Sequence, residues 1–264
     1  MLAEFMIPTM NAALVLGVAA VMPFSLKRQP LPWAIAAVCV IVSLFIPAGH
    51  LAGALVGPWV VLTIFVGLQS LRDRDWWAAM VAGFAGTASI ALTFSRLELT
   101  LFGIVEPIVK LTALHFTYAG AGTLSLAIRV HEARPSKWSA IARWLVLIAP
   151  PIVASGFVLR SAVGQIGGAC LMTAGVWLVA ILQLPDARDG KMKWLWRISC
   201  ASPFIAMVLG VSWAANQYFP SVPALIVPDM VPTHGALNAF GFVLCAHTAC
   251  WLEWRASYAQ PAKS

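Results

Sequence analysis

Two long apolar runs of the sequence contain side chains that can carry or bind protons. "LTALHFTYAG" at 111–120 holds His115 and Tyr118, and "MVPTHGALNAFGF" at 230–242 holds His234 and Asn238. Imidazole exchanges a proton near neutral pH, whereas phenol and amide groups form hydrogen bonds. Burying such groups unpaired costs several kcal/mol each. These residues therefore predict a polar pocket that is suited to proton transfer.

Ionisable residues also flank both runs. Glu106 and Lys110 are one helical turn apart where the first run begins, and Asp229 lies in the connection "YFPSVPALIVPDMVP" before the second. Glu106 and His115 would face opposite sides of a straight helix. Because proline favours the first helical position, Pro107 predicts that Glu106 sits at the helix cap, free to turn toward His115.

The spacing of the polar residues allows them to share one pocket. His234 and Asn238 are four residues apart, and His115 and Tyr118 are three apart, so each pair lies on one face of a helix. His50 ends an earlier apolar run on the same predicted side. We therefore expect these side chains to gather in one half of the molecule.

The elements that carry these residues are predicted to be membrane helices. The chain has 264 residues, of which 61% are hydrophobic and 10% charged, against about a quarter charged in soluble proteins. We predict an all-α, polytopic integral membrane bundle that forms one transmembrane domain over 1–264, with about nine helices and eight as the alternative. The predicted spans are 5–25, 32–48, 53–71, 76–95, 104–128, 140–160, 162–184, 196–216 and 232–252.

Basic residues alternate between the predicted loops. Most Lys and Arg residues lie in or beside every second loop, that is, after the first, third, fifth and seventh predicted spans. These residues are Lys27, Arg28, Arg72, Arg74, Arg129, Arg134, Lys137, Arg188, Lys191, Lys193 and Arg197. By the positive-inside rule these loops are cytoplasmic. We expect a protein of a bacterial cytoplasmic (inner) membrane, with the N-terminus outside and the C-terminus inside. The first apolar run is expected to be a retained span rather than a cleaved signal.

Other residues are expected to have structural roles. Tryptophans near span ends, among them Trp33, Trp59, Trp138, Trp194 and Trp196, are interpreted as interfacial anchors. His131 and His247 are placed near the cytoplasmic interface. The five cysteines, Cys39, Cys170, Cys200, Cys245 and Cys250, lie in apolar runs without the spacing of a metal or redox site and are interpreted as packing residues.

The two polar stretches resemble the YndJ-like family of bacterial membrane proteins. Motifs of that family are close to "HFHYAGF" and "THG..NA.GF", and the matching stretches here are "HFTYAG" and "THGALNAFGF". Thr117 stands where the family pattern has a second histidine, which argues against a metal site with two ligands from this helix. Gly235 is expected to let another helix approach closely. The resemblance singles out His115 and His234 but implies no reaction.

The first functional hypothesis is an intramembrane enzyme that cyclises or isomerises an isoprenoid-like or polyketide-like substrate by acid/base chemistry. Such a reaction needs a proton donor, a base and an apolar cavity that excludes water. Glu106 or Asp229 would be the acid, and His115 or His234 the base. Lys110, Tyr118, Asn238 and His50 are the candidate substrate-binding residues. The partners would be this lipophilic substrate and the bilayer.

Two further functions use the same residues. In a haem or metal protein, His50, His115 and His234 would supply ligands, although His115 is expected roughly 10 Å deeper than the other two. In a proton-coupled transporter or sensor the ionisable groups would relay protons, but the inner half lacks matching polar groups and no internal repeat is evident. No cofactor or metal is expected, and water-soluble enzyme classes are excluded because no phosphate-binding loop, GxSxG or HExxH motif occurs. No nucleic-acid partner is expected, because the basic residues behind the net charge of +7 lie at span ends.

A purely structural role is the alternative for each candidate. Glu106 could cap its helix or pair with Lys110, His115 could bond a neighbouring carbonyl, and Asp229 could be an exposed loop residue. The sequence leaves these alternatives, the substrate and the oligomeric state open.

Overall fold

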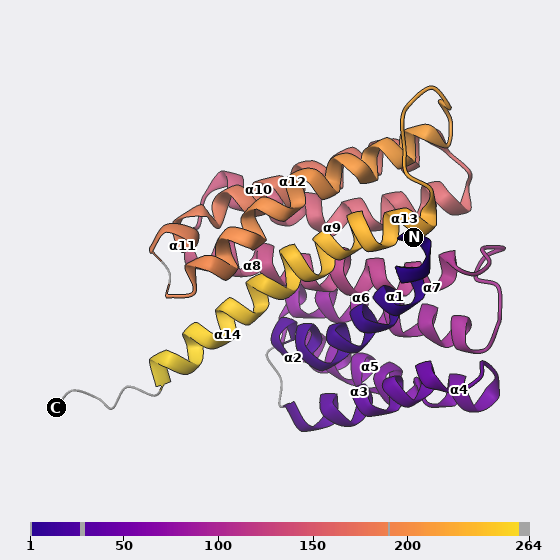
Figure 1. Ribbon diagram of the computed structural model, residues 1–264. Helices are drawn as coiled ribbons and strands as arrows, with labels where there is room; N and C mark the ends of the chain where they lie inside the picture. The colour runs from indigo at the N-terminus through magenta and orange to yellow at the C-terminus, as the bar shows by residue number, and fades with distance from the viewer. Residues whose placement is uncertain (1, 27–29, 190, 259–264) are drawn as a thin grey trace.

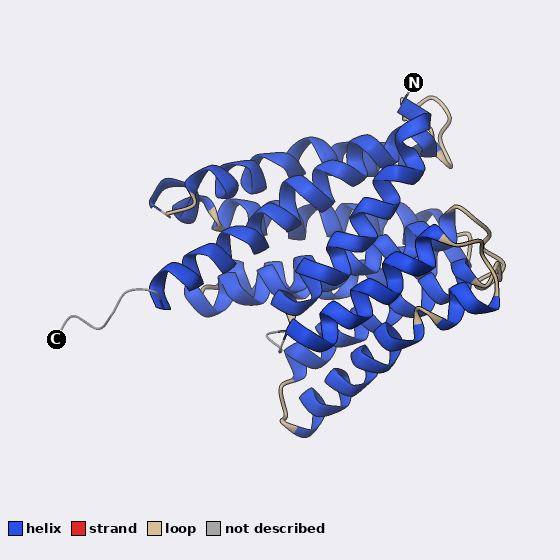
Figure 2. Cartoon of the chain, turned by 60° about the horizontal axis from the view of Figure 1, so that its bottom comes forward, coloured by secondary structure: helices blue, strands red, loops and turns tan. Residues whose placement is uncertain are grey.

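Apolar runs whose backbone groups can bond only within the same segment must form helices. The computed structural model describes residues 2–26, 30–189 and 191–258, and the regular elements in this part of the chain are all helices, joined by loops (Figures 1 and 2). In chain order the helices are η1 (Leu2–Phe5), α1 (Met6–Leu16), η2 (Gly17–Val21), α2 (Met22–Ser25), α3 (Pro30–Phe45), α4 (His50–Ala54), α5 (Gly57–Arg72), α6 (Trp76–Arg96), α7 (Ile108–His115), η3 (Phe116–Gly122), α8 (Thr123–Ala133), α9 (Lys137–Val158), η4 (Val163–Gly167), α10 (Gly168–Leu182), α11 (Leu184–Asp189), α12 (Lys193–Asn216), α13 (Val227–Met230), η5 (Val231–Gly235), η6 (Leu237–Leu244) and α14 (Cys245–Tyr258). Here η1 is a 3₁₀ turn, and η2 to η6 are π-helical turns inside longer helices.

Seven helical segments of the described chain are long and apolar enough to cross a membrane. They are Met6–Ser25, His50–Arg72, Trp76–Arg96, Lys137–Val158, Val163–Leu182, Lys193–Asn216 and Val227–Ala256. Each coincides with a predicted span, which confirms the helical membrane fold. The count of nine stays a prediction.

The other two predicted spans are helical but fall short for different reasons. α3 has 16 residues, whereas a span of the hydrocarbon core takes about 20. The continuous helix α7–η3–α8 is long enough, but it carries Lys110 and His115 along with several threonines and glycines. The polar groups that single this helix out for chemistry are therefore the same ones that lower its hydropathy.

Local sequence signals set several helix ends. The Asp75 carboxylate accepts a hydrogen bond from the Ala78 N–H at 3.0 Å and caps α6. Ser136 and Ser139 cap α9 reciprocally. The last long helix begins at Val227 with Pro228 in its first turn, and not near residue 232 as the sequence predicted. The π turn η5 accommodates Pro232 inside the helix.

The last long helix joins the two halves of the chain. η5, η6 and α14 pack along α12, and the last long helix also contacts η1, α1, α2 and η3. Figure 1 shows this helix crossing the bundle between the group that contains α10 and α12 and the group that contains α1 to α5. Residues of the first span can therefore meet residues of the last one at the centre of the molecule.

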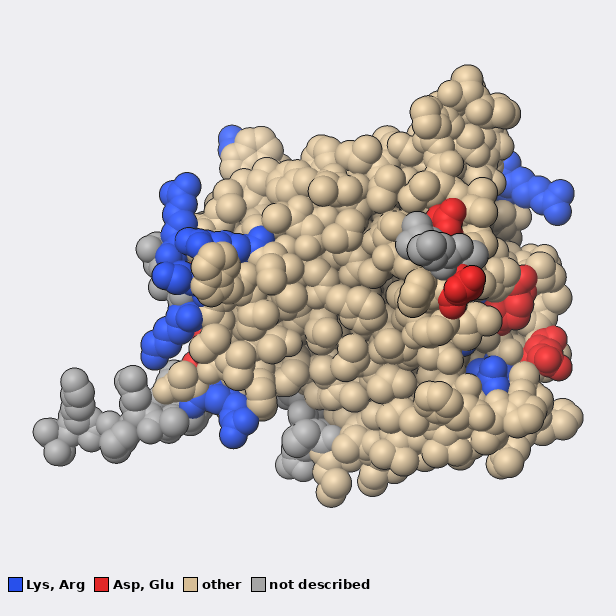
Figure 3. Space-filling model, in the orientation of Figure 1, with Lys and Arg blue, Asp and Glu red and all other residues tan. Residues whose placement is uncertain are grey.

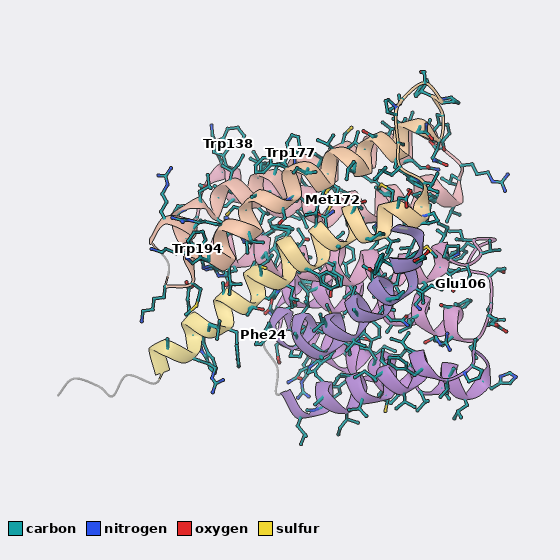
Figure 4. The ribbon with its side chains drawn as sticks, in the orientation of Figure 1. Phe24, Glu106, Trp138, Met172, Trp177 and Trp194 are labelled. Atoms are coloured by element: carbon teal, nitrogen blue, oxygen red, sulfur yellow. The ribbon has the colours of Figure 1, made fainter. Side chains whose placement is uncertain are left out.

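The two ends of the bundle differ in charge. On the face shown in Figure 3, most Lys and Arg side chains gather at the end that carries α11, and Asp and Glu gather at the opposite end. Figure 4 places Trp138 and Trp194 at the first end and Glu106 at the second. The basic residues Lys27, Arg28 and Lys263 lie outside the described residues. Below, the end with Glu106 is called the Glu106 end.

The interfacial interpretation of the tryptophans is wrong for three of them. Trp33, Trp59 and Trp196 are fully buried, because their rings pack between helices. The Arg129 guanidinium lies 4.5 Å from the centroid of the Trp196 ring, which gives that cation an aromatic partner inside the bundle.

Candidate functional site

Two imidazole rings from distant parts of the chain lie beside each other. The ring centroids of His115 and His234 are 6.4 Å apart, and their planes are inclined by 29°. His115 is the last residue of α7, and His234 lies in η5. Each is the eighth residue from the start of its helix, at Ile108 or Val227. Both helices start at the Glu106 end (Figure 1), so both rings lie about 10 Å along the axis from it.

This equal depth corrects the sequence prediction that His115 lies roughly 10 Å deeper than His234. The prediction placed His234 in the first turn of its helix, but the helix begins at Val227 and so adds more than one turn above the ring. Depth therefore does not separate these two imidazoles.

His234 is held against α12. Its Nδ1 lies 2.6 Å from the carbonyl oxygen of Ala206, and because a carbonyl only accepts, Nδ1 carries a proton and donates it. Gly210 lies under the ring: a Cβ there would meet Cε1 of His234 at 2.8 Å. Gly210 thus permits the close approach that the sequence assigned to Gly235. A Cβ at Gly235 would meet only the Met230 carbonyl oxygen, at 3.8 Å, so the expectation for Gly235 is wrong.

His115 is anchored in the same chemical manner. Its Nδ1 donates to the carbonyl oxygen of Leu111 at 2.7 Å, while the side chain as a whole is exposed. Within the described part of the chain, neither His115 nor His234 has a hydrogen-bond partner at Nε2. Each neutral ring therefore offers an Nε2 lone pair, and each protonated ring would offer an N–H there.

The polar residues next to the pair bind the protein itself. The Asn238 side-chain nitrogen lies 3.4 Å from Nδ1 of His234, on the anchored side of the ring. The Tyr118 hydroxyl is buried and donates to the Ala13 carbonyl oxygen at 2.7 Å. Tyr118 thus holds η3 to α1, and its proton is already used.

π-helical turns surround the pair. η3 begins directly after His115, His234 lies within η5, and Asn238 lies within η6. A π turn has i→i+5 hydrogen bonds and is frequent at functional sites. η2, η3 and η6 also contact one another. The sequence signal that could have revealed them is the density of small residues, as in "FTYAGAG".

The remaining predicted site residues lie nearer the Glu106 end. Lys110 donates from Nζ to Oδ1 of Asn11 at 2.6 Å. Glu106 is exposed and precedes Pro107, which is the N-cap of α7 rather than its first helical residue. Asp229 is half-buried in the first turn of α13 and so is not a loop residue.

His50 is separate from the imidazole pair. It is exposed at the start of α4, a short helix that packs against α3 and α6. A hollow of about 330 Å³ lies between α10 and α12, with Thr173 and Val208 in its lining, and neither imidazole of the pair lines it.

The sequence prediction is also wrong for a third histidine. His247 is buried, not interfacial. Its Nδ1 donates to the Val243 carbonyl oxygen at 2.8 Å, and its Nε2 lies 3.1 Å from Oγ of Ser25 and 3.0 Å from Oγ of Ser125. The serine cluster, defined as Ser25, Ser125 and His247, therefore joins α2, α8 and α14. It supplies polar groups in the half of the bundle where the sequence predicted none.

In the described residues, no group of three or more His, Cys, Asp or Glu side chains is assembled that could hold a metal ion. The cysteines are all free thiols. At the imidazole pair, a metal ion would therefore find only two side-chain ligands, the Nε2 atoms of His115 and His234.

The comparison with protein families agrees with the motifs that hold these histidines. A model described as YndJ-like protein matches residues 6–242, which include both His115 and His234. The chain belongs to the YndJ-like family. No curated protein and no solved structure matches it.

The YndJ-like motif around His115 contains one position that the structure explains. Thr117 is buried and donates to the Ala113 carbonyl oxygen at 2.8 Å. Its methyl group would lie 2.6 Å from a Cβ at Gly17. A side chain at position 117 therefore points toward Gly17 at the start of η2.

Proposed function

We propose that this YndJ-like protein catalyses proton transfer within the membrane, in a cyclisation or double-bond isomerisation of a lipophilic, isoprenoid-like or polyketide-like substrate. One observation carries the proposal: two imidazoles face each other at 6.4 Å, and both Nδ1 atoms are occupied by carbonyl oxygens. The two Nε2 atoms are then the groups left for chemistry.

The pair can act as acid and base together. The protonated ring would donate from Nε2 to one carbon of an alkene, and the neutral ring would accept a proton at Nε2 from another carbon. The substrate gains one proton and loses one, so its double bond moves and its composition is unchanged. The pair still holds one Nε2 proton in addition to the two Nδ1 protons, and this proton is now on the other ring. Its transfer between the rings through a water molecule restores the starting state.

The roles of the carboxyl groups change in this proposal. Glu106 lies outside α7 and is exposed, and Asp229 lies more than one turn before His234. We therefore assign the acid role to an imidazolium rather than to Glu106 or Asp229, which would supply protons from the surface. Asn238 would pack beside the anchored nitrogen of His234, and Lys110 would act nearer the surface.

The proposal includes the membrane arrangement. Nine spans, formed by the seven apolar segments together with α3 and α7–η3–α8, would leave the N-terminus outside and the C-terminus in the cytoplasm. The basic end with α11 would be cytoplasmic, which is the orientation expected in a bacterial inner membrane.

A proton-coupled transporter is the second candidate, and the serine cluster favours it. His247 lies on the same long helix as His234, about 20 Å further along the axis at 1.5 Å per residue. Polar groups therefore occur in both halves of the bundle, as a proton path requires.

Deuterium labelling tests the catalytic proposal even while the substrate is unidentified. Membranes that contain the protein are incubated in D₂O, and extracted lipids are compared with those of protein-free membranes by mass spectrometry. We expect one lipid species to gain deuterium on carbon. His115→Gln and His234→Gln should reduce the rate by roughly 10²- to 10⁴-fold, which is the usual contribution of general acid/base groups.

His50→Gln is the matched control, because His50 is exposed and remote from the pair. Equal labelling by wild type, His115→Gln and His234→Gln would refute the assignment. Proton flux into liposomes that depends on His247, without carbon labelling, would favour the transporter. A visible absorption spectrum of the same preparation tests the haem hypothesis.

A further inference from the structure

A pair of cations lies at the Glu106 end, closer to the surface than the imidazoles. Arg96 is at the end of α6, and Lys110 is the third residue of α7, which packs against α6. Both side chains are half-buried. They interact electrostatically with each other and with Glu106, and Arg96 also interacts with Glu98.

Both cations have N–H groups that remain available for further hydrogen bonds. Arg96 donates from one terminal nitrogen to the Ile46 carbonyl oxygen at 2.8 Å, but its buried Nε has no partner. The Lys110 ammonium has three protons and donates one to Asn11 Oδ1. Within the described residues, Glu106 makes no close ion pair with either cation, and its side chain is exposed.

Two like charges at a half-buried place repel each other and lose solvation. The carboxylates of Glu98 and Glu106 attract Arg96, and that of Glu106 attracts Lys110, but both carboxylates are exposed, so an anion placed between the two cations would stabilise them further. A guanidinium binds two oxygens of a phosphate or carboxylate in parallel, and an ammonium adds a point charge. An oxyanion between Arg96 and Lys110 would satisfy both groups, and Asn11 would hold the ammonium in place.

We propose that Arg96, Lys110 and Asn11 bind the anionic head group, phosphate or carboxylate, of an amphiphile in the leaflet at the Glu106 end. The site lies where a head group would sit, because Arg96 ends one helix and Lys110 starts the next. The tail would extend toward the depth of His115. Binding needs neither imidazole, so the inference is independent of the proposed proton transfer.

The experiment measures thermal unfolding of the purified protein in a neutral detergent with three probes: dodecyl phosphate, dodecanol and inorganic phosphate. Dodecyl phosphate should raise the Tm of the wild type, because a ligand that binds only the native state stabilises it. Arg96→Gln and Lys110→Gln should weaken its apparent affinity by roughly 10- to 100-fold. Lys110→Arg keeps a cation and should retain most of the affinity, which separates loss of charge from loss of fold.

Arg160→Gln is the matched control, because Arg160 is an exposed cation in the connection after α9 at the same end of the bundle. It should bind dodecyl phosphate as the wild type does. Equal responses of all variants, or equal stabilisation by dodecanol, would overturn the anion site. Stabilisation by inorganic phosphate as strong as that by dodecyl phosphate would overturn the head-group assignment and indicate a free anion.

Discussion

His115 and His234 face each other at a centroid distance of 6.4 Å, and each is tied through Nδ1 to a backbone carbonyl oxygen. The two anchors differ in kind, because Leu111 belongs to the same helix as His115, whereas Ala206 belongs to α12. The position of His115 is therefore set by its own helix. The position of His234 depends on how closely its helix approaches α12, and this dependence can be tested.

Gly210→Ala should displace His234. The added methyl carbon would lie 2.8 Å from Cε1 of His234, so either the ring or the helix must move, and overpacking of this kind typically costs about 1–3 kcal/mol. We expect a lower Tm in detergent and the loss of most carbon labelling in D₂O. Gly83→Ala is the control, since nothing lies within 4 Å of a Cβ there. Identical behaviour of the two variants would show that His234 is not packed on Gly210.

Chemical modification should distinguish the imidazoles. Diethyl pyrocarbonate attacks an accessible imidazole nitrogen, and Nε2 of His115 and His234 has no hydrogen-bond partner in the described chain, whereas that of His247 faces two serine hydroxyls. Of these three histidines, we expect His115, which is exposed, to react fastest and His247, which is buried, to react slowest in the folded protein. Peptide mass spectrometry measures each site. Faster reaction of His247 than of His115 would contradict the structure.

The serine cluster should respond non-additively to mutation. Ser25 and Ser125 both reach Nε2 of His247, so either hydroxyl can satisfy it after the other is removed. Ser25→Ala and Ser125→Ala should each cost about 0.5–1.5 kcal/mol, and the double variant should cost more than their sum because it leaves Nε2 unpaired. Thermal unfolding measures the effect. Ser155→Ala, at an exposed serine that bonds its own helix, is the control, and strict additivity would count against the shared hydrogen bond.

Cysteine labelling should reveal the proposed topology. In a background with the five native cysteines replaced by alanine, Pro47→Cys and Ser221→Cys should react with an impermeant maleimide in intact cells. Asp73→Cys and Pro135→Cys should react only after the membrane is opened. All four positions are exposed in loops. If Pro47→Cys does not react in intact cells while Ser221→Cys does, α3 does not cross the membrane.

The sequence predicted the helices well because apolar run length directly reports membrane spans. It also selected His115, His234 and Asn238, since imidazole and amide groups in apolar runs need a structural reason. The depth predicted for His234 was wrong, because prolines at 223, 228 and 232 indicated that the last helix starts only near residue 232. A π turn that absorbs Pro232 is not visible as a change in hydropathy.

The partners of the polar groups were harder to foresee than the groups themselves. Asn11, Gly210 and the Ala206 carbonyl lie far in sequence from the residues they hold. His247 was misjudged because its partners, Ser25 and Ser125, are small residues that occur in any helix. Pairing of this kind depends on which helices are neighbours, and one sequence does not state that.

The shortness of α3 has a consequence for the lipids around the protein. Its 16 residues span about 24 Å, whereas the hydrocarbon layer is about 30 Å thick. If α3 crosses, the bilayer must thin along this flank, at a modest elastic cost for each ångström of mismatch. Head groups and water would dip toward the midplane beside α3, and lipids with short or unsaturated chains would be enriched there. The protein would then be surrounded by an uneven lipid shell, thinnest on the side away from α10 and α12.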